Sequence, residues 1–229
     1  MSGLIGVAGL GIAGPAWAVT SVSTLKCTGR TVVSVPASPE VFEIGDSLTV
    51  GDWCYATKAA RASLRFAERK LSVRVDARVG RLTSPGVDVL EGAYPNPLTL
   101  PGTVVFALGT NDAVSGIPLV SYMAQLGAVV DFVGPSRRLY LVTIAYTGAR
   151  VPLRRRVAAF NIAARQLAAS HPNVHVVDFG VLAAAHRGWF AADGVHLGPI
   201  GYSARADLIA RAIQVCTVGC PVVAPPQHP

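Results

Sequence analysis

The feature that most constrains the fold of this 229-residue chain is an alternation of short apolar runs with longer segments of helical periodicity. The apolar runs have the length and the β-branched content of strands, and they predict strands at residues 41–44, 72–76, 103–108, 139–144 and 174–177. Helical patterns follow near residues 53–70, 85–92, 118–133, 153–170 and 199–215. Because strands and helices alternate, right-handed crossovers should give an α/β fold, a three-layer sandwich in which a five-stranded parallel sheet has helices on both faces.

The composition agrees with one enzyme-sized domain. Of the 229 residues, 51% are hydrophobic, so the chain can bury a full core as a single unit. We expect this domain at residues 40–215, after an N-terminal extension at 19–39 and before a Cys- and Pro-rich tail at 216–229.

The first 18 residues resemble a secretory signal peptide. They are uncharged and apolar, and they end in Ala16-Trp17-Ala18, which predicts cleavage after Ala18 and a secreted or cell-envelope protein. No Lys or Arg precedes the apolar run, so an uncleaved N-terminal anchor is an alternative. The glycines of this run and Pro15 disfavour a stable membrane helix.

Ser47 lies in a turn that is suited to a nucleophile. The segment Gly45-Asp46-Ser47-Leu48 follows the first expected strand and precedes the first helical pattern. Backbone N–H groups at a helix start point outward and favour negative charge, so this position suits a serine that generates an anion. Taken alone, Asp46 or Ser47 could merely cap the helix.

Asn111 follows the expected strand at residues 103–108, which should be buried on both faces. Open α/β sheets bind ligands beyond the carboxyl ends of their strands, and a side-chain amide there can donate a hydrogen bond without titrating. Taken alone, Asn111 could shape a turn. By contrast, Asn161 lies in an apolar helical pattern, where a structural role is expected.

Asp193 and His196 lie three residues apart in a loop before the last helix. A carboxylate at this spacing can bind one imidazole nitrogen, which fixes the tautomer of the ring and stabilises its protonated form. The alternative partner is Asp178, which ends the strand at 174–177. With Ser47 as nucleophile, His196 as base, Asp193 as orienting acid and Asn111 as oxyanion donor, these side chains supply what acyl transfer through a serine requires.

Together these motifs resemble the SGNH, or GDSL-type, hydrolase family over about residues 41–213. The residues of these motifs are most similar to those in the SGNH domains of secreted cell-envelope esterases and peptidoglycan O-acetyltransferases. The resemblance implies a flavodoxin-like strand order 2-1-3-4-5, and it makes Gly80 the candidate for a glycine whose N–H joins those of Ser47 and Asn111 in the oxyanion hole. The chain departs from many relatives at Leu197-Gly198, where Pro-Thr is more usual.

The sequence therefore predicts a secreted serine esterase, a monomer that hydrolyses an acyl ester through an acyl-enzyme and needs no metal or organic cofactor. One alternative is an O-acyltransferase, in which a sugar hydroxyl of a cell-envelope glycan replaces water. A second alternative is a non-catalytic module that binds the cell envelope.

The net charge is +7, and arginines gather at residues 137–138 and 150–156. These arginines could form one basic face, although a merely solvated surface is an alternative. No nucleic-acid-binding motif accompanies the charge, so we expect no nucleic acid partner. For an exported protein the expected partner is an anionic cell-envelope polymer or a lipid head group.

Four cysteines in an exported protein predict two disulfides, for which three pairings are possible. We favour Cys27 with Cys54 and Cys216 with Cys220, while a buried free thiol at Cys54 is an alternative. No set of His and Cys residues has the spacing of a zinc site.

Overall fold

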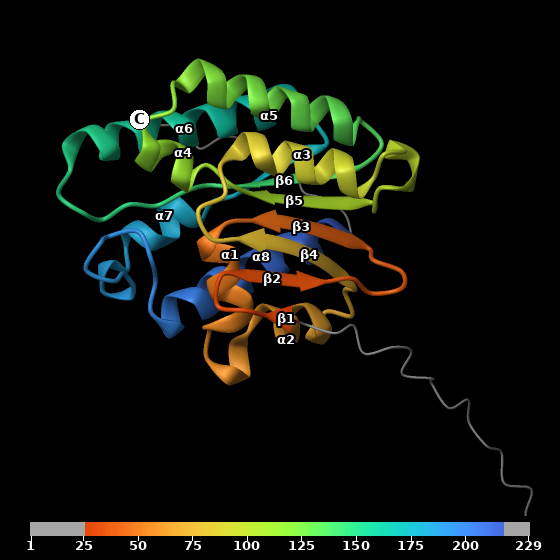
Figure 1. Ribbon diagram of the computed structural model, residues 1–229, viewed down its shortest axis with the longest axis horizontal. Helices are drawn as coiled ribbons and strands as arrows, with labels where there is room; N and C mark the ends of the chain where they lie inside the picture. Colours follow the sequence, from red (N-terminus) through yellow and green to blue (C-terminus); the bar gives the residue numbers. More distant parts are fainter. Residues whose placement is uncertain (1–25, 218–229) are drawn as a thin grey trace, which may run out of the picture.

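A mixed sheet between two layers of helices forms the framework of the computed structural model, which describes residues 26–217 (Figure 1). The seven strands lie in the order β1-β2-β4-β3-β5-β6-β7. They are β1 (Lys26–Cys27), β2 (Thr31–Ser34), β3 (Val41–Gly45), β4 (Val73–Arg78), β5 (Thr103–Ala107), β6 (Arg138–Val142) and β7 (Val174–Val177).

The helices are α1 (Ser47–Cys54), α2 (Ala62–Glu68), α3 (Thr83–Ala93), α4 (Thr110–Ser115), α5 (Leu119–Val133), α6 (Val151–Ser170), α7 (Phe179–Ala184) and α8 (Pro199–Thr217), with short 3₁₀ turns η1 (Lys58–Ala60), η2 (Pro97–Thr99) and η3 (Arg187–Trp189). One face of the sheet packs against α1, α2 and α8, and the other packs against α3, α5 and α6. Among residues 26–217, no helix has both the length and the apolar character of a membrane span.

The five strands expected from the sequence are all present, and β4-β3-β5-β6-β7 are parallel in the expected order 2-1-3-4-5. Strand β3 is central and buried along its whole length. Its side chains alternate between the two cores, with Val41 against the α1 layer and Phe42 against the α3 layer. The carboxyl ends of β3, β4 and β5 therefore meet at one edge of the sheet.

The expectation of a five-stranded, all-parallel sheet is wrong, because β1 and β2 extend it with antiparallel pairs. These strands lie in the segment expected to be an N-terminal extension. β1 has two residues and β2 has four, so neither gives a recognisable periodic pattern. Pairing with β2 satisfies the backbone groups that β4 would otherwise expose at a free edge.

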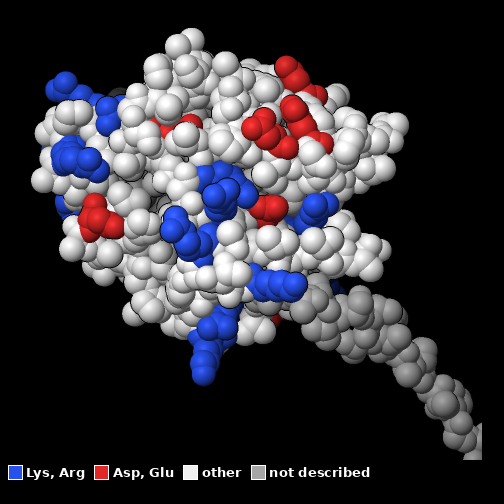
Figure 2. All heavy atoms as spheres, in the orientation of Figure 1, with Lys and Arg blue, Asp and Glu red and all other residues white. Residues whose placement is uncertain are grey.

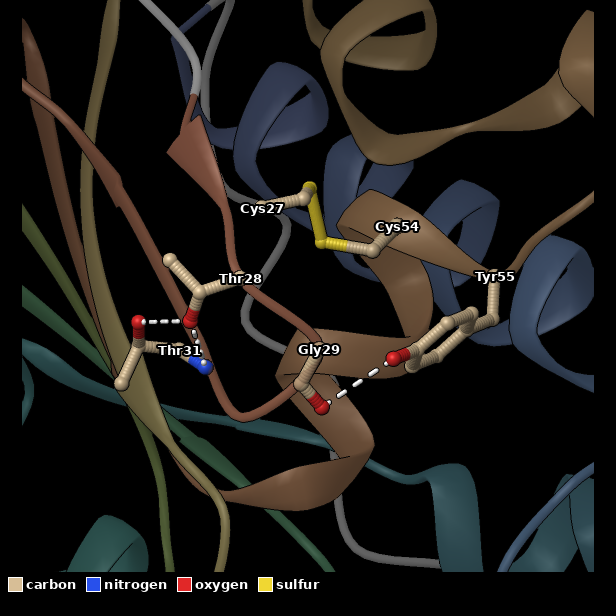
Figure 3. The surroundings of a disulfide bond; sticks show 6 residues. All are labelled: Cys27, Thr28, Gly29, Thr31, Cys54 and Tyr55. Carbon is tan, nitrogen blue, oxygen red and sulfur yellow. Dashed lines mark hydrogen bonds between the residues drawn. A yellow bond between two sulfur atoms is a disulfide. The ribbon is translucent and has the colours of Figure 1, made fainter.

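A disulfide between Cys27 and Cys54 ties this added hairpin to the end of α1, as the sequence predicts (Figure 3). The hairpin turn is reinforced by Tyr55, whose hydroxyl donates to the Gly29 carbonyl at 3.0 Å. Gly29 has a φ of +81°, which favours glycine at this turn. Cys220, the expected partner of Cys216, lies outside the described residues, so that pairing stays a prediction.

The single helix expected at residues 53–70 is also wrong. Helix α1 begins at Ser47, directly after β3, because the Asp46 side chain accepts a hydrogen bond from the backbone N–H of Leu48 at 2.9 Å and so caps the helix. The chain then breaks into α1, η1 and α2. This early start places Ser47 where the turn after β3 passes into the helix, as the first residue of α1.

Candidate active site

Ser47 occupies the turn between β3 and α1 and is 8% exposed. As the first residue of an α-helix, it has a backbone N–H without a partner inside the helix. The positive end of the helix dipole also lies there. The Ser47 backbone is therefore placed to stabilise an anion that forms beside its own side chain.

His196 and Asp193 complete a hydrogen-bonded series with Ser47. His196 Nε2 lies 3.0 Å from Ser47 Oγ, and His196 Nδ1 lies 2.7 Å from Asp193 Oδ2. The second carboxylate oxygen of Asp193 accepts the backbone N–H groups of Val195 and His196, each at 2.9 Å. The carboxylate thus fixes both the loop and the ring, which leaves Nε2 to accept a proton from the serine.

The loop that carries these two residues depends on Gly194. Its φ is +71°, and a Cβ at this position would lie 2.5 Å from the backbone nitrogen of Gly148. The Gly194 carbonyl also accepts the N–H of Thr147 at 3.0 Å. Only glycine fits this close approach, so the loop after β6 holds the Asp193–His196 loop in place.

Asp193 remains ionised although it lies in a folded loop. Burial would raise the pKa of its carboxyl group, but the hydrogen bonds from the His196 ring and from two backbone N–H groups outweigh that effect and lower the pKa. The side chains of Asp193 and His196 are 50% and 45% exposed. Water therefore reaches the imidazole.

Asn111 lies in the first turn of α4, just after β5, and its amide joins the two neighbouring strand ends. Its Nδ2 donates to the Arg81 carbonyl at 3.1 Å and to Asp46 Oδ2 at 3.2 Å. Gly80, with a φ of +78°, sits in the turn after β4 and directly precedes Arg81. The structure thus brings Asn111 to the turn that contains Ser47 and to the turn that contains Gly80.

The alternatives left open by the sequence have other partners. Asp178 forms an ion pair with Arg165 at 2.8 Å and accepts the hydroxyl of Thr143 at 2.9 Å. Asn161 bonds both backbone groups of Ile144, which confirms its structural role. These residues brace the end of β6 and its connection to α6.

A buried charge cluster beneath α1 was not predicted from the sequence. We define it as Glu43, Asp46, Asp52 and Arg205, which are each at most 2% exposed. Arg205 forms an ion pair with Asp52, and Glu43 accepts the indole N–H of Trp53 at 2.8 Å. Burial raises the pKa of all three carboxyl groups, well above the usual range for Asp52, while the Arg205 guanidinium partly offsets this effect. A sequence signal did exist, because Glu43 interrupts the apolar run of β3.

The arginines expected to form one basic face lie at opposite ends of β6. Arg138 begins the strand, whereas Arg150 caps the helix that follows it. Figure 2 shows basic side chains spread over the middle and lower part of the face drawn there and at its left edge, with most acidic ones at the upper right and others at the left edge and in the middle. Exposed basic residues at the antiparallel edge of the sheet are Lys26, Arg30 and Arg78. Within residues 26–217, no group of three or more His, Cys, Asp or Glu side chains is placed to hold a metal ion.

Sequence similarity to known proteins covers most of the folded part of the chain. The sequence profile of the GDSL-like lipase/acylhydrolase family matches residues 44–204. The O-acetyltransferase OatA of Staphylococcus aureus is 30% identical over 149 residues, which are 65% of this chain and 22% of that protein. The chain thus spans about a fifth of the length of the curated relatives it matches.

Solved structures share the fold. The C-terminal catalytic domain of Streptococcus pneumoniae peptidoglycan O-acetyltransferase A superposes with a TM-score of 0.60 at 24% identity, covering 79% of this chain and 96% of that one. A lipase/acylhydrolase from Enterococcus faecalis superposes with a TM-score of 0.65 at 24% identity, covering 77% of this chain and 95% of that one.

Proposed function

Because the chain belongs to the GDSL-like lipase/acylhydrolase family, we propose that it is a secreted, monomeric serine esterase that hydrolyses an acyl ester. The observation that carries this proposal is the hydrogen-bonded series from Ser47 Oγ through His196 to Asp193. A serine in such a series can act as a nucleophile at neutral pH, because the imidazole takes its proton as the hydroxyl attacks.

In the first half of the proposed reaction, Ser47 Oγ attacks the ester carbonyl carbon and His196 Nε2 accepts the hydroxyl proton. The protonated imidazole is stabilised by the ionised Asp193 carboxylate at 2.7 Å. Collapse of the tetrahedral intermediate transfers this proton to the leaving alcohol, and the acyl group remains on Ser47 as an ester.

The oxyanion of the tetrahedral intermediate is the charge that the site has to stabilise. The proposed donors are the backbone N–H groups of Ser47 and Gly80 and the side-chain amide of Asn111. Because the Asn111 amide already donates to Asp46 and to the Arg81 carbonyl, one of its two hydrogens has to change partner when the oxyanion forms. We assign that change to the hydrogen facing Asp46, since the backbone contact fixes the other.

In the second half of the reaction, His196 removes a proton from a water molecule that attacks the acyl group. The half-exposed side chains of Asp193 and His196 support hydrolysis, because water has free access to the base. Acetic or another carboxylic acid is then released, and Ser47 recovers its proton from His196.

A second candidate is an O-acyltransferase that moves the acyl group to a sugar hydroxyl. It is favoured by the name of the Staphylococcus aureus relative, which is an O-acetyltransferase. The two activities share the acyl-enzyme and differ only in what His196 deprotonates next. Transfer needs a bound acceptor, because only a well-oriented hydroxyl, with an effective molarity of about 10⁵ M or more, outcompetes water.

The partition of the acyl group between water and a sugar separates these candidates. We would incubate the purified chain with a short acyl ester, with and without soluble peptidoglycan fragments, and identify the acylated products by mass spectrometry. Free acid as the main product in both mixtures supports the esterase, and acylated glycan as the main product contradicts it. Ser47→Ala is the control, and turnover that survives in this variant would exclude the proposed nucleophile.

The surface charge supports an anionic cell-envelope polymer as the partner of the esterase. The exposed basic residues Lys26 and Arg30 flank β2, and Arg78 ends β4 two residues before Gly80. A polymer bound along this edge would reach the site where the strands end. Binding to an anionic glycan that weakens with salt, and no binding to a neutral glycan, is the expected result.

A further inference from the structure

We propose that Arg81 is a positioning residue, whose side chain and backbone hold the donors of the oxyanion hole in their working arrangement. This inference rests on the proposed function, since an oxyanion hole is needed only for acyl chemistry. Arg81 directly follows Gly80, is 9% exposed and touches the ends of two strands.

The guanidinium of Arg81 joins β3 to β4 at the edge where the site lies. Its Nη1 donates to the Asp76 carbonyl at 2.6 Å and to the Gly45 carbonyl at 3.3 Å. Its Nη2 donates to Asp76 Oδ1 at 2.6 Å, which neutralises the charge of the guanidinium. Gly45 lies two residues before Ser47, so this contact fixes the start of the turn that carries the nucleophile.

The backbone of Arg81 holds the third donor. Its carbonyl accepts one hydrogen of the Asn111 amide at 3.1 Å. All three proposed donors therefore depend on Arg81. Gly80 directly precedes Arg81, and the Asn111 amide donates to its carbonyl. The turn that contains Ser47 begins at Gly45, whose carbonyl accepts from the Arg81 guanidinium. Among the described residues, no other buried charged side chain has this set of contacts.

A second contact anchors the same turn from the other side. Thr83 donates its backbone N–H and its hydroxyl to Asp112 Oδ2, both at 2.9 Å. Asp112 lies next to Asn111 in α4, so the loop after Gly80 remains attached to α4 when the Arg81 side chain is removed. The loss of Arg81 should therefore shift the turn at residue 80 relative to β3 without unfolding the loop.

Lysine cannot replace Arg81 here, because one ammonium does not reproduce a planar fork that donates to two carbonyls and a carboxylate. A shift of the donors by about 1 Å can cost about 100-fold in rate. Arg81→Met should therefore lower kcat by about 100-fold with KM little changed, since the donors act in the transition state rather than in substrate binding.

The test compares Arg81→Met and Arg81→Lys with Arg74→Met in the hydrolysis of a short acyl ester. Arg74 is the matched control, because it is a partly buried arginine on β4, the strand that leads to the turn at Gly80, and its guanidinium lies over the rings of Phe42 and Tyr94. We expect both Arg81 variants to lose kcat and Arg74→Met to keep it, at a temperature well below each Tm. If Arg81→Met does not fold, Arg81→Gln takes its place.

The decisive readout is a double-mutant cycle with Asn111→Ala. If Arg81 acts through Asn111 and Gly80, its substitution should cost much less than 100-fold in the Asn111→Ala background. Equal losses in both backgrounds, a loss confined to KM, or Arg81 variants as active as Arg74→Met would overturn the inference. A failure of the proposed function would be recognised separately, because the wild-type chain would then show no ester hydrolysis that is lost in Ser47→Ala.

Discussion

Two pairs of an aspartate with a basic side chain lie near α1 and α8, and they differ in exposure, in the pKa of the acid and in their expected role. Asp193 and His196 lie just before α8, are about half exposed and contact Ser47 at the start of α1. Asp52 and Arg205 lie within α1 and α8 and are almost fully buried. Hydrogen bonds lower the pKa of Asp193, whereas burial raises that of Asp52.

This difference indicates a catalytic role for the exposed pair and a role in stability for the buried pair. An exposed pair contributes little to folding, so it is free to exchange protons with substrate and water. A buried pair has lost its hydration, so breaking it leaves an uncompensated charge inside the protein. We therefore expect substitutions in the exposed pair to affect the rate of acyl chemistry, and substitutions in the buried pair to affect the free energy of unfolding.

The largest expected effect is on the rate, at Ser47 and His196. Ser47→Ala and His196→Ala should each lower kcat by about 10⁶, and the double variant should be little worse than either, because the two residues act as one unit. Steady-state kinetics on a short acyl ester gives the losses. Near-additive losses would show that the two side chains act separately, and Ser203→Ala, a serine in α8, is the control.

The next largest effect on kcat is expected at Asp193, the acid that orients His196. Asp193→Asn should lower kcat by about 10⁴ through the wrong imidazole tautomer, while Tm changes little. The matched control is Asp178→Asn, which removes the partner of Arg165 and should leave kcat within a few-fold. Greater loss in Asp178→Asn than in Asp193→Asn would reverse the assignment of the acid.

The buried pair should respond in stability. Arg205→Met should lower the free energy of unfolding by about 3–5 kcal/mol, and Asp52→Asn combined with Arg205→Met should recover most of it, since no unpaired charge remains. Urea titration measures both. The control is Arg211→Met, because Arg211 pairs with Asp207 on the same helix but is 69% exposed, so a loss under about 1 kcal/mol is expected. A double variant as unstable as Arg205→Met would contradict a buried ion pair.

The disulfide should contribute somewhat less to the free energy of unfolding than the buried pair of Asp52 and Arg205. Cys27→Ser with Cys54→Ser should cost about 2–4 kcal/mol of unfolding free energy, because the bond closes a loop with a sequence separation of 27 residues. Activity at low temperature should persist, since β1 and β2 lie at the edge of the sheet. The comparison of urea midpoints with and without reductant, in wild type and in the variant, measures the loss. A midpoint of the variant that still falls in reductant would mean that another bond is responsible.

The smallest effect is a difference in pH dependence. Burial raises the pKa of Glu43 above its ordinary value of 4.5, so the folded state keeps a proton that the unfolded chain releases. Stability should therefore fall as pH rises above about 4.5, by about 1.4 kcal/mol for each unit by which the pKa is raised. Glu43→Gln keeps an acceptor for Trp53 and should flatten this slope. An unchanged slope of stability against pH in Glu43→Gln would contradict the raised pKa of Glu43.

Asp193 should behave in the opposite sense. Its lowered pKa stabilises the fold at neutral pH, and this contribution is lost as pH falls below its ordinary value of 3.8. Asp193→Asn should abolish that loss, whereas Glu43→Gln should not. The two substitutions thus separate the exposed pair from the buried charge cluster by the sign of their pH dependence.

The sequence predicts those parts of the molecule that follow from local chemistry. Ser47 and Asn111 directly follow apolar runs, and the carboxyl ends of parallel strands must meet, so their proximity could be inferred. Asp193 and His196 are three residues apart, and their contact is local. The strand order also follows, since it rests on crossover rules and on the resemblance to a known family.

The contacts that could not be predicted join residues far apart in the chain. Arg205 binds Asp52 across 153 residues, and Asn111 binds the Arg81 carbonyl across 30. No periodicity marks such partners. The strands β1 and β2 were missed for another reason, because they are too short to show alternation and are defined by pairing with β4. The break after Cys54 was missed because residues 53–70 keep a helical composition throughout.

The most direct test of the central claim is whether Ser47 carries the acyl group during turnover. The chain is mixed with an activated acetate ester, quenched in acid within the first turnovers, digested and mapped by mass spectrometry. The account predicts one acetyl group on Ser47. Turnover without an acetyl adduct, or an adduct on a residue other than Ser47, would contradict it.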